Sequence, residues 1–264
     1  MAFWQDKCVL ITGASSGIGW ALAEYLGSRG AVLGLMARRE ERLAELAAAI
    51  ASAGGRAAFV PVDVTDTEQT KRASRKLEER LGPCDVLIAS AGVHHYTPGA
   101  AFDPDSANTV IATNVQGVIN SIGAVLPGMV ARRSGHVVAV ASIAAMLGLP
   151  DVGAYSASKA AVVTLMESLR VDLHGCRVKV TTICPGFVDT PLIADHGHGV
   201  LRFVLSPPEA ARRIARAIER GRREYWVPWQ MWLLARVGRA LPFGLYRRVC
   251  KRLHERGVGN SRLP

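Results

Sequence analysis

The chain has 264 residues, of which 49% are hydrophobic and 20% are charged. This balance is typical of a folded protein with a sizeable core, and it excludes an intrinsically disordered chain. The formal net charge of +10 is concentrated at one end, because residues 211–264 carry 14 of the 32 Lys and Arg but only three of the 22 Asp and Glu.

The length allows one large α/β domain or two small ones. The five cysteines form no CxxC pair, so we expect reduced, mostly buried thiols and neither a disulfide framework nor a metal site. No signal segment is recognisable at the N-terminus, and no run of about 18 apolar residues occurs. These features predict a cytoplasmic enzyme.

The N-terminal segment predicts a strand, a tight turn and a helix. Residues 7–12 form an apolar run, a glycine-rich turn follows at 13–19, and a helical pattern covers 20–29. The backbone N–H groups of such a turn and of the helix start can receive a pyrophosphate. The spacing is GxxxGxG rather than GxGxxG, so the general dinucleotide fingerprint is not met as written.

A second strand at 31–37 leads into Arg38 and Arg39 and a helix that reaches about residue 53. At this place an acidic residue would hold the ribose 2′-hydroxyl of NAD, whereas an arginine suits the 2′-phosphate of NADP. The alternative is that both arginines only form the solvated first turn of the helix. Because arginine there opposes the helix dipole, the phosphate interpretation is favoured.

The rest of the chain continues the alternation of strands and helices. Strands are predicted at 57–62, 85–89, 136–141, 178–183 and 225–227, and helices at 65–81, 105–132, around Tyr155 and at 208–220, with Thr65 and Asp66 capping the first of these helices. This order predicts a single-domain α/β protein with a doubly wound, Rossmann-like parallel sheet. We place the domain at 1–227 and a basic helical extension at 228–264.

Tyr155 and Lys159 are the most suggestive pair in the chain. They are four residues apart in a helical pattern and so leave the same face of the helix. An ammonium next to a phenol favours the tyrosinate, so Lys159 is expected to lower the pKa of Tyr155 toward the range of an acid/base catalyst. Alone, such a pair could equally be two surface residues.

Several small or polar residues fall where predicted strands end. They are Gly13–Gly19, Arg38, Asp63, Gly92, Ser142 and Pro185–Gly186. In an open parallel sheet ligands bind at the carboxyl edge of the strands, so these residues predict one site.

On these motifs the chain resembles the short-chain dehydrogenase/reductase family over about residues 5–225. The matching features are Thr12-Gly13-x-x-x-Gly17-Ile18-Gly19, Asp63-Val64, Asn114, Ser142, Tyr155-x-x-x-Lys159 and Pro185-Gly186-x-Val188-x-Thr190. One departure is that the family's Asn-Asn-Ala-Gly appears as Ala89-Ser90-Ala91-Gly92, which is expected to alter local stability rather than chemistry.

The resemblance implies a carbonyl/alcohol oxidoreductase that uses NADP(H). Tyr155 would exchange a proton with the substrate oxygen, Ser142 would polarise the carbonyl, Lys159 would hold the nicotinamide ribose, and Asn114 would hold a water for proton relay. The implied cofactor-binding residues are Gly13, Ser15, Ser16, Gly17, Ile18, Gly19, Arg38, Arg39, Asp63, Val64, Ala91, Gly92, Tyr155, Lys159, Pro185, Gly186, Val188 and Thr190.

The substrate side is expected to be apolar, which suits a lipid-, steroid- or acyl-like ketone or secondary alcohol. The residues expected to face the substrate are Ser142, Tyr155, His94, Met146, Phe187 and Leu192. Residues 187–205, with Gly197, Gly199, His196 and His198, predict a mobile lid. The loop histidines do not predict a metal, because no carboxylate cluster accompanies them.

The extension 228–264 predicts two basic amphipathic helices. Trp229, Trp232, Leu233, Val237, Ala240 and Leu241 share one face of the first helix, which Pro228 can open, and Leu245, Val249 and Leu253 share one face of the second. Such helices resemble segments that lie on anionic membranes, so peripheral membrane contact is one expectation. The other is that the apolar faces cover the pocket or form a subunit interface. Nucleic-acid binding is not expected.

The function expected from the sequence is an NADP(H)-dependent oxidoreductase for a hydrophobic carbonyl or alcohol. The alternative is a non-catalytic dinucleotide-binding regulator on the same fold. The resemblance also implies a homodimer or homotetramer assembled through the long helices.

Overall fold

The computed structural model describes residues 3–193 and 204–257, with side chains described up to residue 252. A single seven-stranded sheet organises the molecule, in the order β3-β2-β1-β4-β5-β6-β7, and every neighbouring pair is parallel. The strands are β1 (Cys8–Thr12), β2 (Val32–Ala37), β3 (Arg56–Pro61), β4 (Val86–Ala89), β5 (Gly135–Val140), β6 (Val178–Pro185) and β7 (Glu224–Val227).

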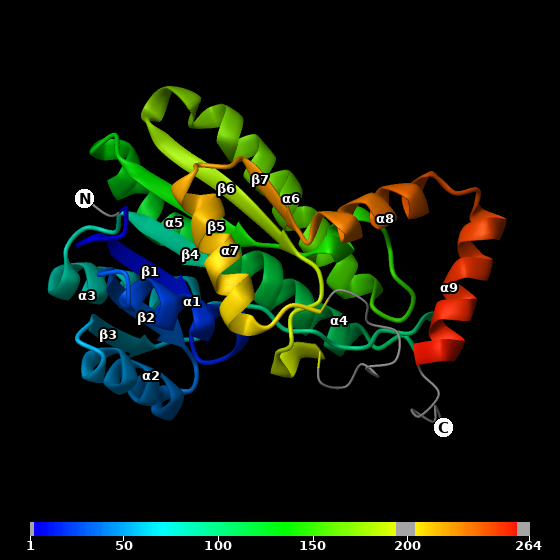
Figure 1. Ribbon diagram of the computed structural model, residues 1–264, viewed down its shortest axis with the longest axis horizontal. Coiled ribbons are helices and arrows are strands. Elements are labelled where there is room, and N and C mark those ends of the chain that lie inside the picture. Colours follow the sequence, from blue (N-terminus) through cyan, green and yellow to red (C-terminus); the bar gives the residue numbers. More distant parts are fainter. Residues whose placement is uncertain (1–2, 194–203, 258–264) are drawn as a thin grey trace.

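Helices cover both faces of the sheet (Figure 1). The helices on one face are α1 (Gly17–Gly27), α2 (Glu40–Ser52) and α7 (Pro207–Glu219). Those on the other are α3 (Thr67–Leu81), α5 (Gly117–Ala131) and α6 (Gly153–Asp172). The strands read as unbroken apolar runs because both of their faces are buried: in β1, Val9 and Ile11 join one core cluster while Leu10 joins the other.

This architecture confirms the predicted doubly wound α/β fold. The capping prediction before α3 is also confirmed, since the Asp66 carboxylate accepts from the backbone N–H of Gln69 at 2.8 Å. The chain reverses its direction of winding between β1 and β4, which lie side by side in the sheet. That switch point is where the carboxyl ends of the strands leave room for a ligand.

The long helix predicted at 105–132 is divided in the structure. It consists of α4 (Pro104–Ile111), a π-helical turn (Ala112–Gln116) and α5. By length and composition, residues 104–131 could span a membrane, but 44% of the apolar window is buried inside the fold. Core helices pass the same test, and Val118, Ile122, Val125 and Met129 of α5 belong to the core.

Two further helices follow β7, and α9 lies farthest from the sheet (Figure 1). They are α8 (Trp229–Ala240) and α9 (Phe243–Gly257). Pro228 is the residue before α8 rather than its first residue, a shift of one position from the prediction. The predicted start of the extension at residue 228 coincides with the end of β7.

Candidate active site

A cavity of about 550 Å³ lies along the carboxyl edge of the sheet. It is bounded by the segments that follow β1, β2, β3, β4, β5 and β6. All eighteen predicted cofactor-binding residues line it, as do Ser142, His94, Phe187 and Leu192. The sequence therefore located the cavity, while the roles assigned to these residues stay predictions.

The glycine-rich turn brings two backbone segments closer than a side chain would allow. Gly13 has a φ of +69°, and a Cβ there would lie 2.7 Å from the backbone of Ala91. A Cβ on Gly19 would lie 2.4 Å from the carbonyl oxygen of Gly13. Ser16 precedes α1 without a side-chain cap, so it leaves the first N–H groups of this helix to another acceptor. This cradle fits the pyrophosphate of a dinucleotide.

Arg39 crosses the glycine-rich turn and braces it. Its guanidinium donates to the Ser15 hydroxyl at 3.0 and 3.2 Å, to the Ser15 carbonyl at 3.3 Å and to the Ser16 hydroxyl at 2.8 Å. Arg38 instead points into solvent, with 67% of its side chain exposed, and lies 4.0 Å from the Asp63 carboxylate. Of the two arginines, Arg38 has the more donors available for a ligand phosphate.

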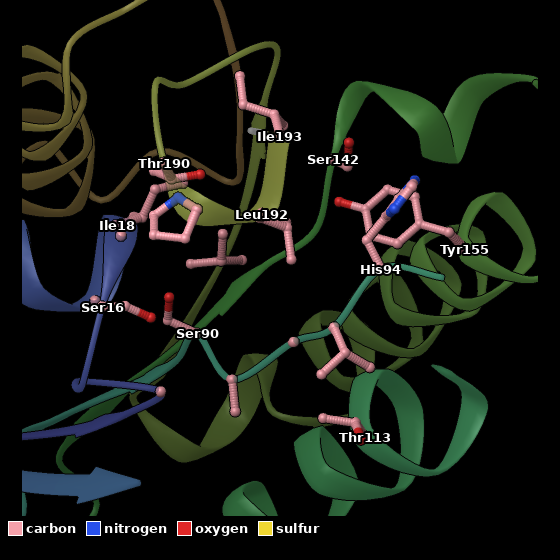
Figure 2. A pocket seen from close by; sticks show the side chains of 18 of the residues that line it. Ser16, Ile18, Ser90, His94, Thr113, Ser142, Tyr155, Thr190, Leu192 and Ile193 are labelled. Carbon is pink, nitrogen blue, oxygen red and sulfur yellow. The ribbon is translucent and has the colours of Figure 1, made fainter. Parts of the chain in front are cut away.

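Ser142, Tyr155 and Lys159 meet at the other end of the cavity. Figure 2 shows the hydroxyls of Ser142 and Tyr155 close together, across the cavity from Ser16 and Ile18. The Lys159 ammonium lies 5.6 Å from the centre of the Tyr155 ring and donates to the carbonyl of Val140 at 3.0 Å. A helical spacing of four residues and the end of β5 thus bring a phenol, an ammonium and a hydroxyl together.

Burial, rather than the ammonium, dominates the protonation of Tyr155. Desolvation raises the pKa of its phenol above 10, and the hydrogen bond with Ser142 partly opposes this. Burial also lowers the pKa of Lys159 from 10.5 to about 8. The predicted lowering of the Tyr155 pKa is therefore wrong for this arrangement, because removal of the phenol from water is the largest effect.

Asn114 lies beside the cavity rather than in its lining. It is fully buried in the π-helical turn, where its side-chain oxygen accepts from the backbone N–H of Val93 at 2.8 Å. Its amide donates to the Val93 carbonyl and to the Ser158 hydroxyl, each at 3.0 Å. The side chain therefore ties the segment after β4 to α6, and the relay role implied by the resemblance stays a prediction.

Five of the six residues expected to face the substrate line the cavity, and Met146 does not. The His94 ring packs edge-on against Tyr155, with 5.0 Å between the ring centres (Figure 2). Phe187 and Leu192 lie on the segment after β6. Met146 is not part of the lining, because Ile143–Met146 forms a 3-10 turn and turns this residue toward α8, where its carbonyl accepts from Arg239 at 2.7 Å.

Sequence reasoning missed several lining residues. They include Val62, Val93, Thr113 and Val152. Val62 could have been found, since it directly precedes Asp63 at a predicted strand end. Thr113 could not, because it belongs to the π-helical turn. The predicted lid at 187–205 lies partly outside the described residues, since 194–203, with His196 and His198, are not among them.

Comparisons with known proteins agree with this geometry. Residues 7–199 match the family described as short chain dehydrogenase. An uncharacterized oxidoreductase of Myxococcus xanthus is 38% identical over 253 residues, covering 96% of this chain and all of that protein. A ketoacyl reductase of Nostoc sp. is 31% identical over 222 residues, covering 83% of this chain and 77% of that protein. The crystal structure of a short chain dehydrogenase/reductase from Burkholderia phymatum in complex with NAD has a TM-score of 0.82 at 27% identity, covering 89% of this chain and 94% of that one.

Proposed function

The chain belongs to the short-chain dehydrogenase family of oxidoreductases, and from this premise we propose that it interconverts a hydrophobic ketone and its secondary alcohol with NADP(H). One observation carries the proposal: Ser142, Tyr155 and Lys159 lie together at one end of the cavity. The glycine-rich turn at 13–19 forms the other end. When bound, the dinucleotide supplies or accepts the hydride.

Tyr155 is the proton donor in the reductive direction. Because burial raises its pKa, the phenol keeps its proton at neutral pH and can pass it to a substrate oxygen that gains negative charge. Ser142 shares this end of the cavity with Tyr155 (Figure 2). Its hydroxyl would donate a hydrogen bond to the same substrate oxygen. Lys159, largely protonated at neutral pH, stabilises the charge that develops on Tyr155.

The preference for NADP(H) rests on Arg38. Its exposed guanidinium stands at the end of β2, where the ribose of the dinucleotide is held in this fold class, and no acidic residue occupies that position. The Burkholderia protein was crystallised with NAD, so the preference proposed for this chain depends on Arg38 rather than on family membership.

The substrate is proposed to be lipophilic. Ile143, Ala144, Leu149, Val152, Phe187 and Leu192 line the cavity next to Tyr155 and offer an apolar surface. The ketoacyl reductase from Nostoc sp. is a relative whose name describes a substrate of this kind. The chain is further proposed to form a homo-oligomer, as the resemblance implies, which the molar mass from light scattering would test.

The test combines nucleotide binding with turnover. We expect NADPH to raise the melting temperature more than NADH, and activity to increase with chain length across a series of ketones. Tyr155→Phe should lower kcat/KM by about 10²–10⁴-fold without changing the NADPH-induced shift. Tyr25→Phe on α1 is the matched control and should leave both values unchanged.

Two outcomes would contradict the proposal. Nucleotide binding without turnover of any ketone or alcohol would favour the dinucleotide-binding regulator. Full activity of Tyr155→Phe would assign the proton transfer to another group.

A further inference from the structure

Helix α8 packs against the body through a narrow face of small or flexible side chains. Ala235 is the buried residue of this helix. A Cβ on Gly238 would be in ordinary van der Waals contact with Leu147 of the segment after β5, at 3.6 Å, and Met231 lies next to Gly186 after β6. Met231, Ala235 and Gly238 are three or four residues apart and so share one face. The helix is seated on two segments that also form the cavity wall.

The opposite face of α8 is apolar and exposed. Trp229, Leu233 and Val237 recur every four residues and are 64%, 47% and 53% exposed. Leu234 beside them is exposed as well. A surface helix normally turns its apolar face to the core and its polar face to water. Here the order is partly reversed: of the apolar face predicted from the sequence, Trp229, Leu233 and Val237 are exposed, whereas Trp232 is half-buried.

Helix α9 also exposes apolar residues, and it adds charge. Phe243 is 78% exposed, and Leu245 and Val249 are exposed too. Arg247, Arg248, Lys251 and Arg252 are also exposed, and helical spacing places them together on the other side of the helix. We call α8 and α9 together the C-terminal hairpin, a name for the pair only, since α9 turns steeply away from α8 instead of lying antiparallel to it (Figure 1).

Two side chains of the hairpin bind the loop after the 3-10 turn Ile143–Met146. The guanidinium of Arg239 donates to the Met146 carbonyl at 2.7 Å, and the Tyr246 hydroxyl donates to the Gly148 carbonyl at 2.5 Å. The exposed apolar residues are therefore displayed by helices that are held to the body.

The positive charge of the hairpin indicates which kind of partner could cover its apolar residues. The hairpin, residues 229–257, carries seven Lys and Arg against one acidic residue, whereas the rest of the chain has 25 basic and 21 acidic residues. A symmetric contact with a second copy would place these like charges against one another. A nucleic acid would use the basic residues but would leave the tryptophan, leucine and phenylalanine side chains in water.

We propose that the C-terminal hairpin docks on the surface of an anionic lipid bilayer. Trp229, Leu233, Val237 and Phe243 enter the interfacial layer, and the basic residues of α9 contact lipid phosphates. Because α8 rests on Gly186 and on the loop that carries Leu149, docking brings the cavity wall next to the lipid. This last consequence rests on the proposed function, whereas the docking does not.

Vesicle co-sedimentation of the full chain, without nucleotide or substrate, tests the docking. Phosphatidylcholine vesicles with about 30% phosphatidylglycerol should bind the protein, and raising the salt from about 0.1 M to about 1 M should release most of it. Leu233→Ser/Phe243→Ser should lower the partition coefficient about tenfold. Arg247→Gln/Arg248→Gln should lower it by a similar factor.

Matched controls use exposed residues far from the hairpin. Val171→Ser on α6 and Arg72→Gln/Arg75→Gln on α3 remove the same kinds of side chain and should leave vesicle binding unchanged. Since the hairpin variants change only exposed side chains, their activity toward a soluble short-chain ketone should equal that of the parent.

Three results would overturn the proposal. The first is equal vesicle binding by the parent and the Leu233→Ser/Phe243→Ser variant. The second is a parent oligomer that this variant dissociates, which would assign the apolar face to a second copy. The third is salt-sensitive DNA binding with no vesicle binding. Loss of activity alone would count against the proposed function and not against docking.

Discussion

Arg38 and Arg39 are adjacent in the sequence, but their side chains differ in solvent exposure and in hydrogen-bond partners. Arg39 is bound to Ser15 and Ser16 and holds the glycine-rich turn in shape. Arg38 is mostly exposed. Its ion pair with Asp63 is long, at 4.0 Å, and both side chains are exposed to water, so this contact does little to hold the Arg38 side chain in place. One arginine thus shapes the site, and the other is free to recognise a ligand.

This difference predicts two distinct binding defects. Arg38→Gln should raise the Kd for NADPH about 10–100-fold, the effect of losing charge-assisted hydrogen bonds to a phosphate, and leave NADH nearly unchanged. Arg39→Gln should weaken both nucleotides, because it loosens the turn that both of them use. Isothermal titration of each variant with each nucleotide measures the difference. Equal losses for Arg38→Gln would contradict its role at the 2′-phosphate.

At the scale of an element, the turn from β1 into α1 tolerates no added side chain. A Cβ on Gly19 would meet the Gly13 carbonyl oxygen at 2.4 Å, and that backbone atom has no room to move. Gly19→Ala should therefore destabilise the protein by about 1–3 kcal/mol and abolish nucleotide-induced stabilisation. Denaturant unfolding with and without NADPH would show both effects.

Gly123 in α5 is the matched control for Gly19. It is exposed, and a Cβ there would meet nothing within 4 Å. Gly123→Ala should raise the free energy of unfolding by about 0.5–1 kcal/mol, because alanine has the higher helix propensity. Equal destabilisation by both substitutions would show that the effect at Gly19 is not a local clash.

The elements themselves were predictable from the sequence because buried parallel strands appear as continuous apolar runs. The π-helical turn was not predictable, since no local pattern marks it and its Asn114 bonds to Val93 and Ser158, which lie 21 and 44 residues away in the chain. The sequence likewise identified the apolar face of α8, but it did not show whether this face is turned toward the body of the protein or toward solvent. In the fold, the face of α8 that meets the body is instead the one with Met231 and Gly238, next to Gly186 and Leu147.

The candidate site, too, was only partly predictable from the sequence. The order of strand ends places all the predicted cofactor residues around one cavity, because parallel strands end at one edge. The pKa of Tyr155 depends instead on how much water reaches the phenol. Spacing shows which groups are neighbours, whereas burial follows from the packing of the whole fold.

At the scale of the whole molecule, His136 links the core of the sheet to its acid stability. It is buried in β5, and its Nε2 lies 2.8 Å from the Thr181 hydroxyl of β6, which donates its only proton to the Arg222 carbonyl at 2.6 Å. Nε2 must therefore carry the proton that His136 donates to Thr181. Burial, helped by Lys179 and Lys7, lowers the pKa of His136 from 6.5 to about 4.

This shift predicts a defined loss of stability in acid. Between pH 6.5 and about 4, His136 is protonated in the unfolded chain but stays neutral in the folded protein. The unfolded state therefore binds more protons, and the free energy of unfolding falls as the pH falls. By pH 5 the loss from this residue should be about 2 kcal/mol. His136→Gln should lack it, and urea unfolding at several pH values would reveal a shallower dependence than in the parent.

Exposed His174 provides the control, since His174→Gln should reproduce the pH dependence of the parent. If His136→Gln and the parent gave parallel curves, carboxylates elsewhere would have to account for the acid sensitivity. Because Thr181 joins His136 of β5 to Arg222 before β7, we expect protonation of His136 to disturb the packing of β5, β6 and β7. Acid should therefore weaken nucleotide binding in the parent before the fold as a whole is lost.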